Sequence, residues 1–568
     1  MRKRLLRTPA AIFIAVLLLT IFASSADANS LRPHSTHAKA ARLARHGPDA
    51  NADMGADADQ GDRQTLLDSD DARYFLTRSG FAPDERTLAS YVGLSREQAV
   101  DKLLATARTT PVTPMPAWVD EPIPTRAEER ALDPQARRAE GAERGRRYEA
   151  LRGWWIHEMA TRPSPLTERM TLFWHGHFTS GQDKVPYPQL MARQNALLRR
   201  YALGSFADML HAVAKDPAML MYLDGAGNRK GHPNENFARE VMELFTLGEG
   251  HYGQRDVSEA ARAYTGWSLD PDTRAYVWRA DWHDAGEKTV LGHTGAFDGD
   301  AVLDLLLAQP QTATFIVTEL WREFVSETPD PAQIERIAAR FRSSGYDIAV
   351  ALRGLFSTDA FWDVRNRGVL VKSPAQFVVG ALRSFDVDDD DMTPLAGTLR
   401  NLGQNLFAPP NVKGWPGGST WINSTTLLAR EQFVEQLFRS TGPNRAKAKA
   451  NANANAKGMP PPSMSGSAAK GASTMTAMRD MAGERMAASM RPASAPGNAM
   501  RAQHGMRFDL DGWLARYGTA PTERSGLSIE LQLQHAVLPI SPVDPIDTGT
   551  SSSAYLRALL MDPAYQLD

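Results

Sequence analysis

The stretch from residue 219 to residue 267 constrains the fold of this chain more than any other. After a glycine-rich loop that ends at Pro233, Asn234 is a favoured N-cap residue. Glu235 follows in the first turn, where the helix dipole favours a carboxylate. Apolar residues then recur at the i, i+4, i+7 and i+8 spacing of a buried helical face: Phe237, Val241, Leu244 and Phe245. The stretch therefore predicts an amphipathic helix with one face in a core.

The residues after this helix predict where it ends and how a second helix begins. Gly248 is well placed to end the first helix in the left-handed conformation. Asp256, with Glu259 three residues later, resembles a capping box at the start of the next helix. That second helix is expected to turn four residues inward: Val257, Ala260, Ala261 and Tyr264.

The polar side of the first helix is unusual. Asn236, Glu240 and Glu243 are spaced i, i+4 and i+7, so they form one line along it. Two carboxylates one turn apart repel each other unless a cation, a metal or a shared proton lies between them. This line is therefore a candidate for chemistry.

The same stretch closely resembles the signature of a large family of exported bacterial proteins, domain-of-unknown-function family 1800. The resemblance is carried by NENFAREVMELFTLGEGHY from residue 234 and DVSEAARAYTGW from residue 256. The FWHGHF motif from residue 173 and the PPNVKGWPGG loop from residue 409 also match the family's pattern. The resemblance implies a shared fold but no established reaction.

Helical periodicity recurs over most of the chain and predicts a mainly α protein with a single large multi-helical domain. This helical family domain is expected at residues 70–440, and further helices at 506–568 complete it. Alternation of Ala275, Val277 and Arg279 with aromatic residues predicts a short strand in a small β-hairpin excursion.

Two regions have compositions that cannot form a packed core. Residues 29–69 hold few large apolar residues and predict a disordered leader, and residues 441–505 form a low-complexity Met/Ala-rich insert. Thioether ligands select Cu(I), whereas the irregular spacing of these methionines is typical of a flexible linker.

The N-terminus predicts export to the periplasm or the extracellular space. A basic segment with Arg2, Lys3 and Arg4 precedes an apolar run at 10–23 and an A-x-A site that ends at Ala28, which predicts a signal peptide at residues 1–28. The alternative is an uncleaved membrane anchor, although the run is short for a span. No other stretch is apolar enough to cross a bilayer.

Composition excludes several classes of protein. The chain has no cysteine, which excludes disulfides, thiolate zinc sites and cysteine nucleophiles. The formal net charge of -2 gives no electrostatic reason to expect a nucleic-acid partner. The chain also lacks the G-x-S-x-G, Walker and H-E-x-x-H motifs.

The first candidate site joins His175 and His177 to Glu240, Glu243 and Asn236. Imidazole and carboxylate ligands suit zinc, manganese or iron, so the two histidines and two glutamates are candidate ligands of a divalent metal. Residues i and i+2 of a helix, however, point roughly 160° apart, so both histidines reach one metal only if the helix is unwound between them. The alternative is a buried polar network in which these groups satisfy one another.

Two weaker candidates concern substrate binding. His283 and Lys288 fall on the predicted hairpin, where binding residues are often placed, although Asp284 could equally build a turn there. Trp415 lies in a glycine-rich loop, where it could stack on a sugar ring or a partner chain, or else fill the core beneath the loop.

Two functions follow from these patterns. Members of the family are commonly encoded beside an exported sulfatase-like protein, so the resemblance implies an accessory or binding partner of such a protein. The alternative is a metal-dependent enzyme, a hydrolase that uses His177, Glu240 and Glu243. Convergence of these groups on a pocket would favour the enzyme, and sealed burial would favour the accessory role.

Overall fold

The computed structural model describes residues 63–441, 505–517 and 527–568. The predicted signal peptide at 1–28, most of the predicted leader at 29–69 and nearly all of the predicted insert at 441–505 lie outside these residues. Those three assignments therefore stay predictions. The first helix whose bounds are described begins at Ser69, close to the predicted start of the helical domain.

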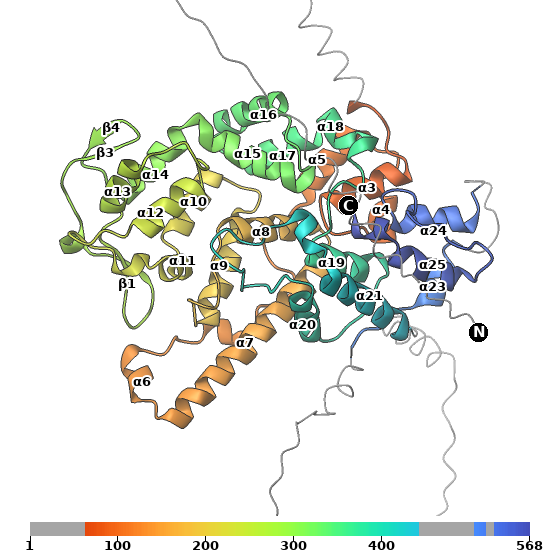
Figure 1. The fold of residues 1–568 in the computed structure, drawn as a ribbon, viewed down its shortest axis with the longest axis horizontal. Coiled ribbons are helices and arrows are strands. Elements are labelled where there is room, and N and C mark those ends of the chain that lie inside the picture. The colour runs from red at the N-terminus through yellow and green to blue at the C-terminus, as the bar shows by residue number, and fades with distance from the viewer. Residues whose placement is uncertain (1–62, 442–504, 518–526) are drawn as a thin grey trace, which may run out of the picture. The chain divides into compact units, whose positions relative to one another are not determined.

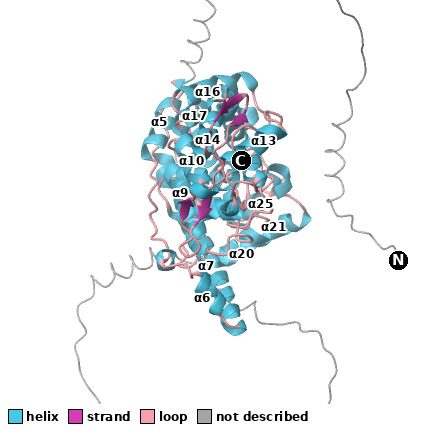
Figure 2. Ribbon diagram, turned by 90° about the vertical axis from the view of Figure 1, so that its left-hand side faces the viewer, coloured by secondary structure: helices cyan, strands magenta, loops and turns pink. Residues whose placement is uncertain are grey.

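Helices dominate the described residues, which confirms the mainly α fold class (Figure 2). Within the described residues, five helices precede the FWHGHF motif: α3 (Ser69–Arg78), α4 (Glu85–Ala89), α5 (Arg96–Thr106), α6 (Arg126–Ala131) and α7 (Pro134–Thr161). Six more carry that motif and the signature stretch: α8 (Pro165–His177), α9 (Pro188–Tyr201), α10 (Phe206–Ala214), α11 (Pro217–Tyr222), α12 (Glu235–Glu243) and α13 (Gln254–Ala263).

The second half of the chain is helical as well. Five helices follow the strands: α14 (Gly299–Ala308), α15 (Pro310–Phe324), α16 (Pro331–Ser343), α17 (Ile348–Phe356) and α18 (Asp359–Trp362). The last six described helices are α19 (Pro374–Ser384), α20 (Thr393–Asn401), α21 (Ser424–Arg439), α23 (Leu510–Leu514), α24 (Ile529–Val537) and α25 (Ser552–Met561). Elements from opposite ends of the described chain lie side by side, since α3 packs against α24 (Figure 1).

The β excursion consists of two hairpins. β1 (Trp267–Leu269) pairs antiparallel with β2 (Tyr276–Trp278), and β3 (Lys288–Val290) pairs antiparallel with β4 (His293–Gly295). The second hairpin turns through Leu291 and Gly292, both at positive φ (49° and 79°). Such a turn suits the twist of a two-residue hairpin but usually contains Asn or Gly at its first position, so Leu291 gave little signal in the sequence.

The signature helix begins as predicted and ends earlier. The Asn234 side chain caps α12 by accepting a hydrogen bond from the backbone N–H of Asn236 at 3.0 Å. The helix ends at Glu243, so Gly248, at a φ of 80°, lies in the turn that follows it rather than at its end. The N-cap of α13 is Gly253, and the Asp256 carboxylate at the third helical position accepts from the Gly253 N–H at 2.8 Å. Asp256 thus closes the cap from inside the helix, because glycine has no side chain to do so.

A buried ion pair fixes helix α8, which carries the FWHGHF motif. The Arg199 guanidinium of α9 donates to both carboxylate oxygens of Glu168 on α8, at 2.7 and 2.8 Å, and both side chains are fully buried. Removal of Glu168 would leave the buried Arg199 charge without its carboxylate, and removal of Arg199 would leave Glu168 with the more distant Arg162 guanidinium, at 3.5 Å, as its counter-charge, so this pair holds α8 against α9.

A helix that spans a membrane must be both long and apolar. In the described part of the chain, no single helix is long and apolar enough to cross a bilayer. The bent pair formed by α14 and α15 meets the criterion by length and composition when the two are taken together.

Candidate functional site

A groove of about 870 Å³ lies between helix α8, helix α15 and the loop at residues 412–421. Helix α8 lines it with residues spaced i, i+3, i+4, i+7 and i+8, one continuous face: Arg169, Leu172, Phe173, Gly176 and His177. Helix α15 lines it with one face as well: Phe315, Glu319, Arg322 and Glu323. The last residue of α12, Glu243, and the turn after it contribute four more residues: Glu243, Leu244, Gly248 and Glu249.

The loop at residues 412–421 closes onto helix α8 because Gly414 allows it. Gly414 has a φ of +75°, and a Cβ atom there would lie 2.6 Å from the carbonyl oxygen of Gly176. This close approach places Trp415, which stays partly exposed on the groove, with its ring centroid 5.6 Å from that of His175. Trp415 therefore both covers the core and presents an aromatic face to the groove.

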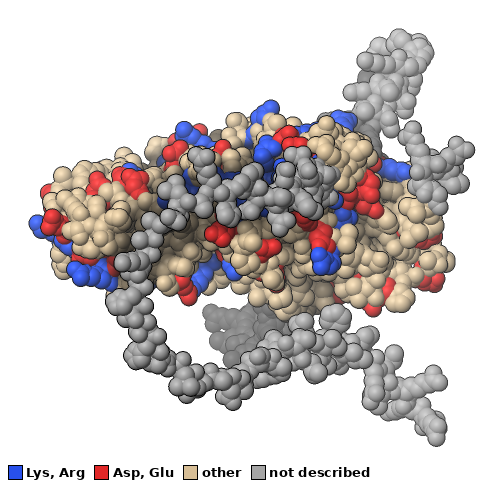
Figure 3. Space-filling view, turned by 90° about the horizontal axis from the view of Figure 1, so that it is seen from above, with Lys and Arg blue, Asp and Glu red and all other residues tan. Residues whose placement is uncertain are grey.

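The groove carries more acidic than basic side chains. Five glutamates line it (Glu243, Glu249, Glu319, Glu323 and Glu327), against three basic residues (Arg169, Arg322 and Lys413). Arg169 pairs with Glu323 at 2.9 Å and its side chain is only 3% exposed. Burial raises the pKa of the Glu323 carboxyl, while the Arg169 charge acts in the opposite direction. Beyond the groove, acidic and basic side chains are interspersed on the described surface seen in Figure 3.

His177 lies at the edge of the groove with its ring enclosed by aromatic side chains. Six aromatic rings surround it at centroid distances of 4.7 to 6.4 Å: Phe173, Trp174, Phe178, Phe206, Phe245 and Phe315. Burial lowers the pKa of His177 to about 4, so the ring is neutral near pH 7. Its Nε2 lies 3.2 Å from the Phe245 carbonyl oxygen and, as the donor of a neutral ring, fixes the tautomer.

His175 lies away from the groove. Helix α8 continues through Gly176 to His177, so the two histidines diverge as the helical period requires. The His175 ring packs among Trp155, Phe407 and Trp415, and its Nε2 accepts from the Phe407 N–H at 3.3 Å. Burial lowers the pKa of His175 to about 4 as well.

The three residues that form the polar line on α12, Asn236, Glu240 and Glu243, lie in different environments. Glu243 lines the groove, where the Tyr252 hydroxyl donates to its carboxylate at 2.5 Å and the Lys413 ammonium lies 3.6 Å away. Glu240 is 9% exposed, and burial, followed by the charge of Glu243, raises its pKa. Asn236 is exposed at the start of the helix. Of the three, only Glu243 shares the groove with His177.

The predicted metal ligands are not gathered into one set. The part of the chain that the structure describes contains no group of three or more His, Asp or Glu side chains able to hold a metal ion. The four predicted ligands lie in four different environments. His175 is buried among aromatic rings, and His177 contacts a backbone carbonyl oxygen. Glu240 is buried on α12, and Glu243 accepts a hydrogen bond from Tyr252.

His283 and Lys288 hold the connection between the two hairpins and do not line the groove. The Lys288 ammonium donates to the carbonyl oxygens of Asp284 and Gly286 at 2.5 and 2.9 Å. The His283 Nδ1 contacts the Thr265 carbonyl oxygen at 2.8 Å. The Arg262 guanidinium beside Asp284 holds the pKa of that carboxyl at about 2. These contacts fit the alternative in which the residues form a turn.

Sequence reasoning missed Arg169, Phe315, Glu319 and Glu323. A usable signal was present for two of them, because Glu319 and Glu323 are spaced one turn apart (i, i+4) on a helix whose other face is apolar, and the glutamates of α12 are likewise about one turn apart (i, i+3). Nothing local pairs Arg169 with Glu323, which lies on a helix more than a hundred residues further along the chain.

A family model described as "Protein of unknown function (DUF1800)" matches residues 74–567. The chain belongs to this family, which confirms the resemblance seen in its signature stretch. No curated protein and no solved structure matches the chain. The groove is lined by residues from the FWHGHF motif, the signature stretch and the GWPGG loop, so the segments that carry the resemblance converge on one place.

Proposed function

We propose that this protein is an exported accessory protein that binds a partner in the groove between α8 and α15. By the family resemblance, that partner is an exported sulfatase-like protein. The observation that carries the proposal is the lining of the groove, where His177, Glu243 and Trp415 meet an excess of carboxylates on an open surface.

The lining indicates which part of a partner fits. Partly exposed aromatic rings such as Trp415 are typical anchors of protein interfaces, because they bury a large area at low entropic cost. Five glutamates against three basic residues favour a positively charged segment. A basic, extended or looped segment of the partner therefore suits this groove best.

The test is a binding measurement with the purified sulfatase-like protein. Trp415→Ala should weaken binding at least about tenfold, since loss of an interface anchor typically costs more than 1 kcal/mol. Trp278→Ala is the matched control, because Trp278 is 45% exposed on β2 and does not line the groove. Equal affinities for both variants, or no binding by the unaltered protein, would contradict the proposal.

Export is a separate part of the proposal and rests on the N-terminal sequence. The basic segment, the apolar run and the A-x-A site together support a cleaved signal peptide. N-terminal sequencing of exported material should begin at or close to Asn29. Recovery of the uncleaved chain in membranes alone would count against cleavage.

A second candidate is a metal-dependent hydrolase that acts in the same groove. It is favoured by one observation, that His177 and Glu243 both line the groove. Elemental analysis of the purified protein separates the two functions. Stoichiometric zinc, manganese or iron that is lost in both His177→Phe and Glu243→Gln would favour the hydrolase.

A further inference from the structure

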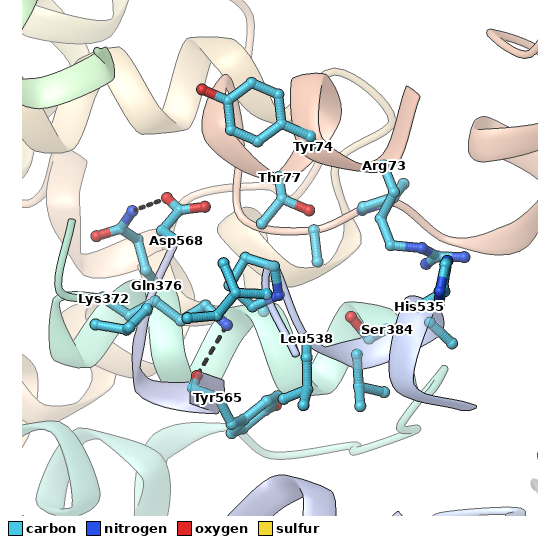
Figure 4. Close-up of a pocket in the computed structure, with 18 of the residues that line it drawn as sticks. Arg73, Tyr74, Thr77, Lys372, Gln376, Ser384, His535, Leu538, Tyr565 and Asp568 are labelled. Atoms are coloured by element: carbon cyan, nitrogen blue, oxygen red, sulfur yellow. Dashed lines mark hydrogen bonds between the residues drawn. The ribbon is translucent and has the colours of Figure 1, made fainter. Parts of the chain in front are cut away.

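A second, smaller cavity of about 300 Å³ lies between α3, α19, α24 and residues 565–568 (Figure 4). Much of its wall is apolar: Phe81, Phe377, Phe385, Leu538, Ile540 and Tyr565 all line it. Polar and charged residues make up the rest of the wall, among them Arg73, Lys372 and Asp568, so the cavity joins an apolar surface to charged groups, as a site for an amphipathic small molecule does.

The most unusual of these groups is the amine of Lys372. The residue is only 8% exposed, and its Nζ donates to the Tyr565 carbonyl oxygen at 3.0 Å and lies 4.5 Å from the centre of the Tyr565 ring. A lysine ammonium has three N–H donors. None of the described residues offers this amine a second hydrogen-bond acceptor, so two donors remain for a ligand.

The acidic groups of the cavity, in contrast, already have partners. The Asp568 carboxylate accepts from the Gln376 amide at 3.0 Å, and the Asp70 carboxylate accepts from His535 at 2.6 Å. On the opposite side of the cavity from Lys372, Arg73 lies beside His535, and its buried Nε has no hydrogen-bond partner (Figure 4). The cavity therefore has spare donors rather than spare acceptors.

We propose that this cavity binds a small organic monocarboxylate with an apolar tail. The ligand carboxylate accepts hydrogen bonds from the Lys372 amine, and its tail lies against Phe377, Phe385 and Leu538. A buried ammonium with unmade hydrogen bonds is costly, and an anion offsets that cost. The neighbouring Asp568 carboxylate disfavours a doubly charged ligand such as a phosphate monoester, because like charges repel at short range.

The test uses octanoate as the probe, with octanamide and octylamine as neutral and cationic counterparts of the same length. Titration calorimetry on the whole protein at pH 7 should show saturable binding of octanoate at one site and none of the other two. Lys372→Met should weaken octanoate binding at least about tenfold, as expected when a charged hydrogen bond is lost. Lys413→Met is the matched control and should bind octanoate as the unaltered protein does, because Lys413 lies in the groove.

A second measurement keeps the proposal testable if Lys372→Met does not fold. Burial lowers the pKa of Lys372 to about 8, with Asp568 acting against this and Arg430 adding to it. Above that pH the amine of the unaltered protein must take up a proton to bind a carboxylate, so affinity should fall by up to about tenfold per pH unit. Octanoate affinity that is unchanged between pH 7 and pH 9.5, or equal binding of octanamide, would overturn the proposal, as would no binding at pH 7.

Discussion

The groove and the cavity share a wall, yet they offer opposite environments. Leu370, Val371 and Ser373 line the groove, Lys372 lines the cavity, and Gln376 lines both. In the groove, charged groups such as Lys413 and Glu249 are exposed and pair across its surface. In the cavity, Lys372 and Asp568 are only 8% and 3% exposed. The short segment at residues 370–376 thus separates two environments. On the groove surface a charged group loses little hydration free energy, whereas in the cavity a charged group needs a partner of opposite charge or hydrogen bonds to offset its desolvation.

The largest effect expected from this difference concerns Arg78, which is fully buried behind the cavity. Its guanidinium donates to the carbonyl oxygens of Val325, Asn366 and Asp568 at 3.3, 2.8 and 2.7 Å. Arg78→Ala should lower the free energy of unfolding by about 3–5 kcal/mol, because the carbonyl oxygens of Val325 and Asn366 lose a donor and the buried Asp568 carboxylate loses a counter-charge 3.9 Å away. Arg322→Ala, at a groove residue that is 51% exposed, should change it by less than about 0.5 kcal/mol. Chemical denaturation measures both, and similar losses would remove the contrast.

A second prediction concerns pH and Lys372. Because burial lowers the pKa of this amine from 10.5 to about 8, the unfolded chain holds its proton over a pH range in which the folded protein has lost it. The free energy of unfolding should therefore rise by about 2–3 kcal/mol relative to Lys372→Met as pH rises from about 8 to 10.5. This gain in stability should disappear when the pH is returned to 8. Denaturation of both proteins across this range gives the difference, and parallel curves would show that the amine is not desolvated.

A smaller effect of the same kind is expected for His177 at the edge of the groove. Its pKa is lowered from 6.5 to about 4, so folding favours the neutral ring. The stabilisation is complete above pH 6.5 and is lost as pH falls toward 4. Relative to His177→Phe, the loss should be about 1–2 kcal/mol, because partial exposure of the ring to solvent reduces the effect. Thermal or chemical denaturation between pH 4 and 7 tests this. A ring that is open to water would give no difference in slope.

The smallest effect is expected at Gly176, on the groove face of α8. A Cβ atom there would meet nothing within 4 Å, and the residue is helical. Gly176→Ala should therefore raise the free energy of unfolding by about 0.4–1 kcal/mol, because alanine restricts the unfolded chain. Gly414→Ala provides the contrast, since its positive φ and the Gly176 carbonyl oxygen both oppose a side chain. A loss of stability in Gly176→Ala would mean that the groove is narrower here than the structure shows.

The sequence predicted the helices better than their meeting place. Phe237, Val241 and Phe245 are buried as their spacing predicted, because helical periodicity is a local property. The groove, however, joins α8, α15 and the loop at residues 412–421, and no local pattern states which distant faces will meet. His177, Glu243 and Trp415 were selected from motifs and line the groove. The same reasoning grouped His175 and Asn236 with His177 and Glu243, whereas neither His175 nor Asn236 lines the groove. Lys372 stands among apolar residues and gave no signal, since its burial depends on residues near position 565.

The contact between Arg78 and Asp568 spans 490 residues of the chain. A ribosome releases α3 early, whereas α24 and residues 565–568 emerge late, long after every element of the groove has appeared. The face of α3 that lines the cavity, which carries Asp70, Arg73, Tyr74 and Thr77, therefore lacks its late partners during most of synthesis. The order of translation thus separates the two sites in time: the groove can assemble first, and the cavity closes only when the most distant parts of the described chain meet.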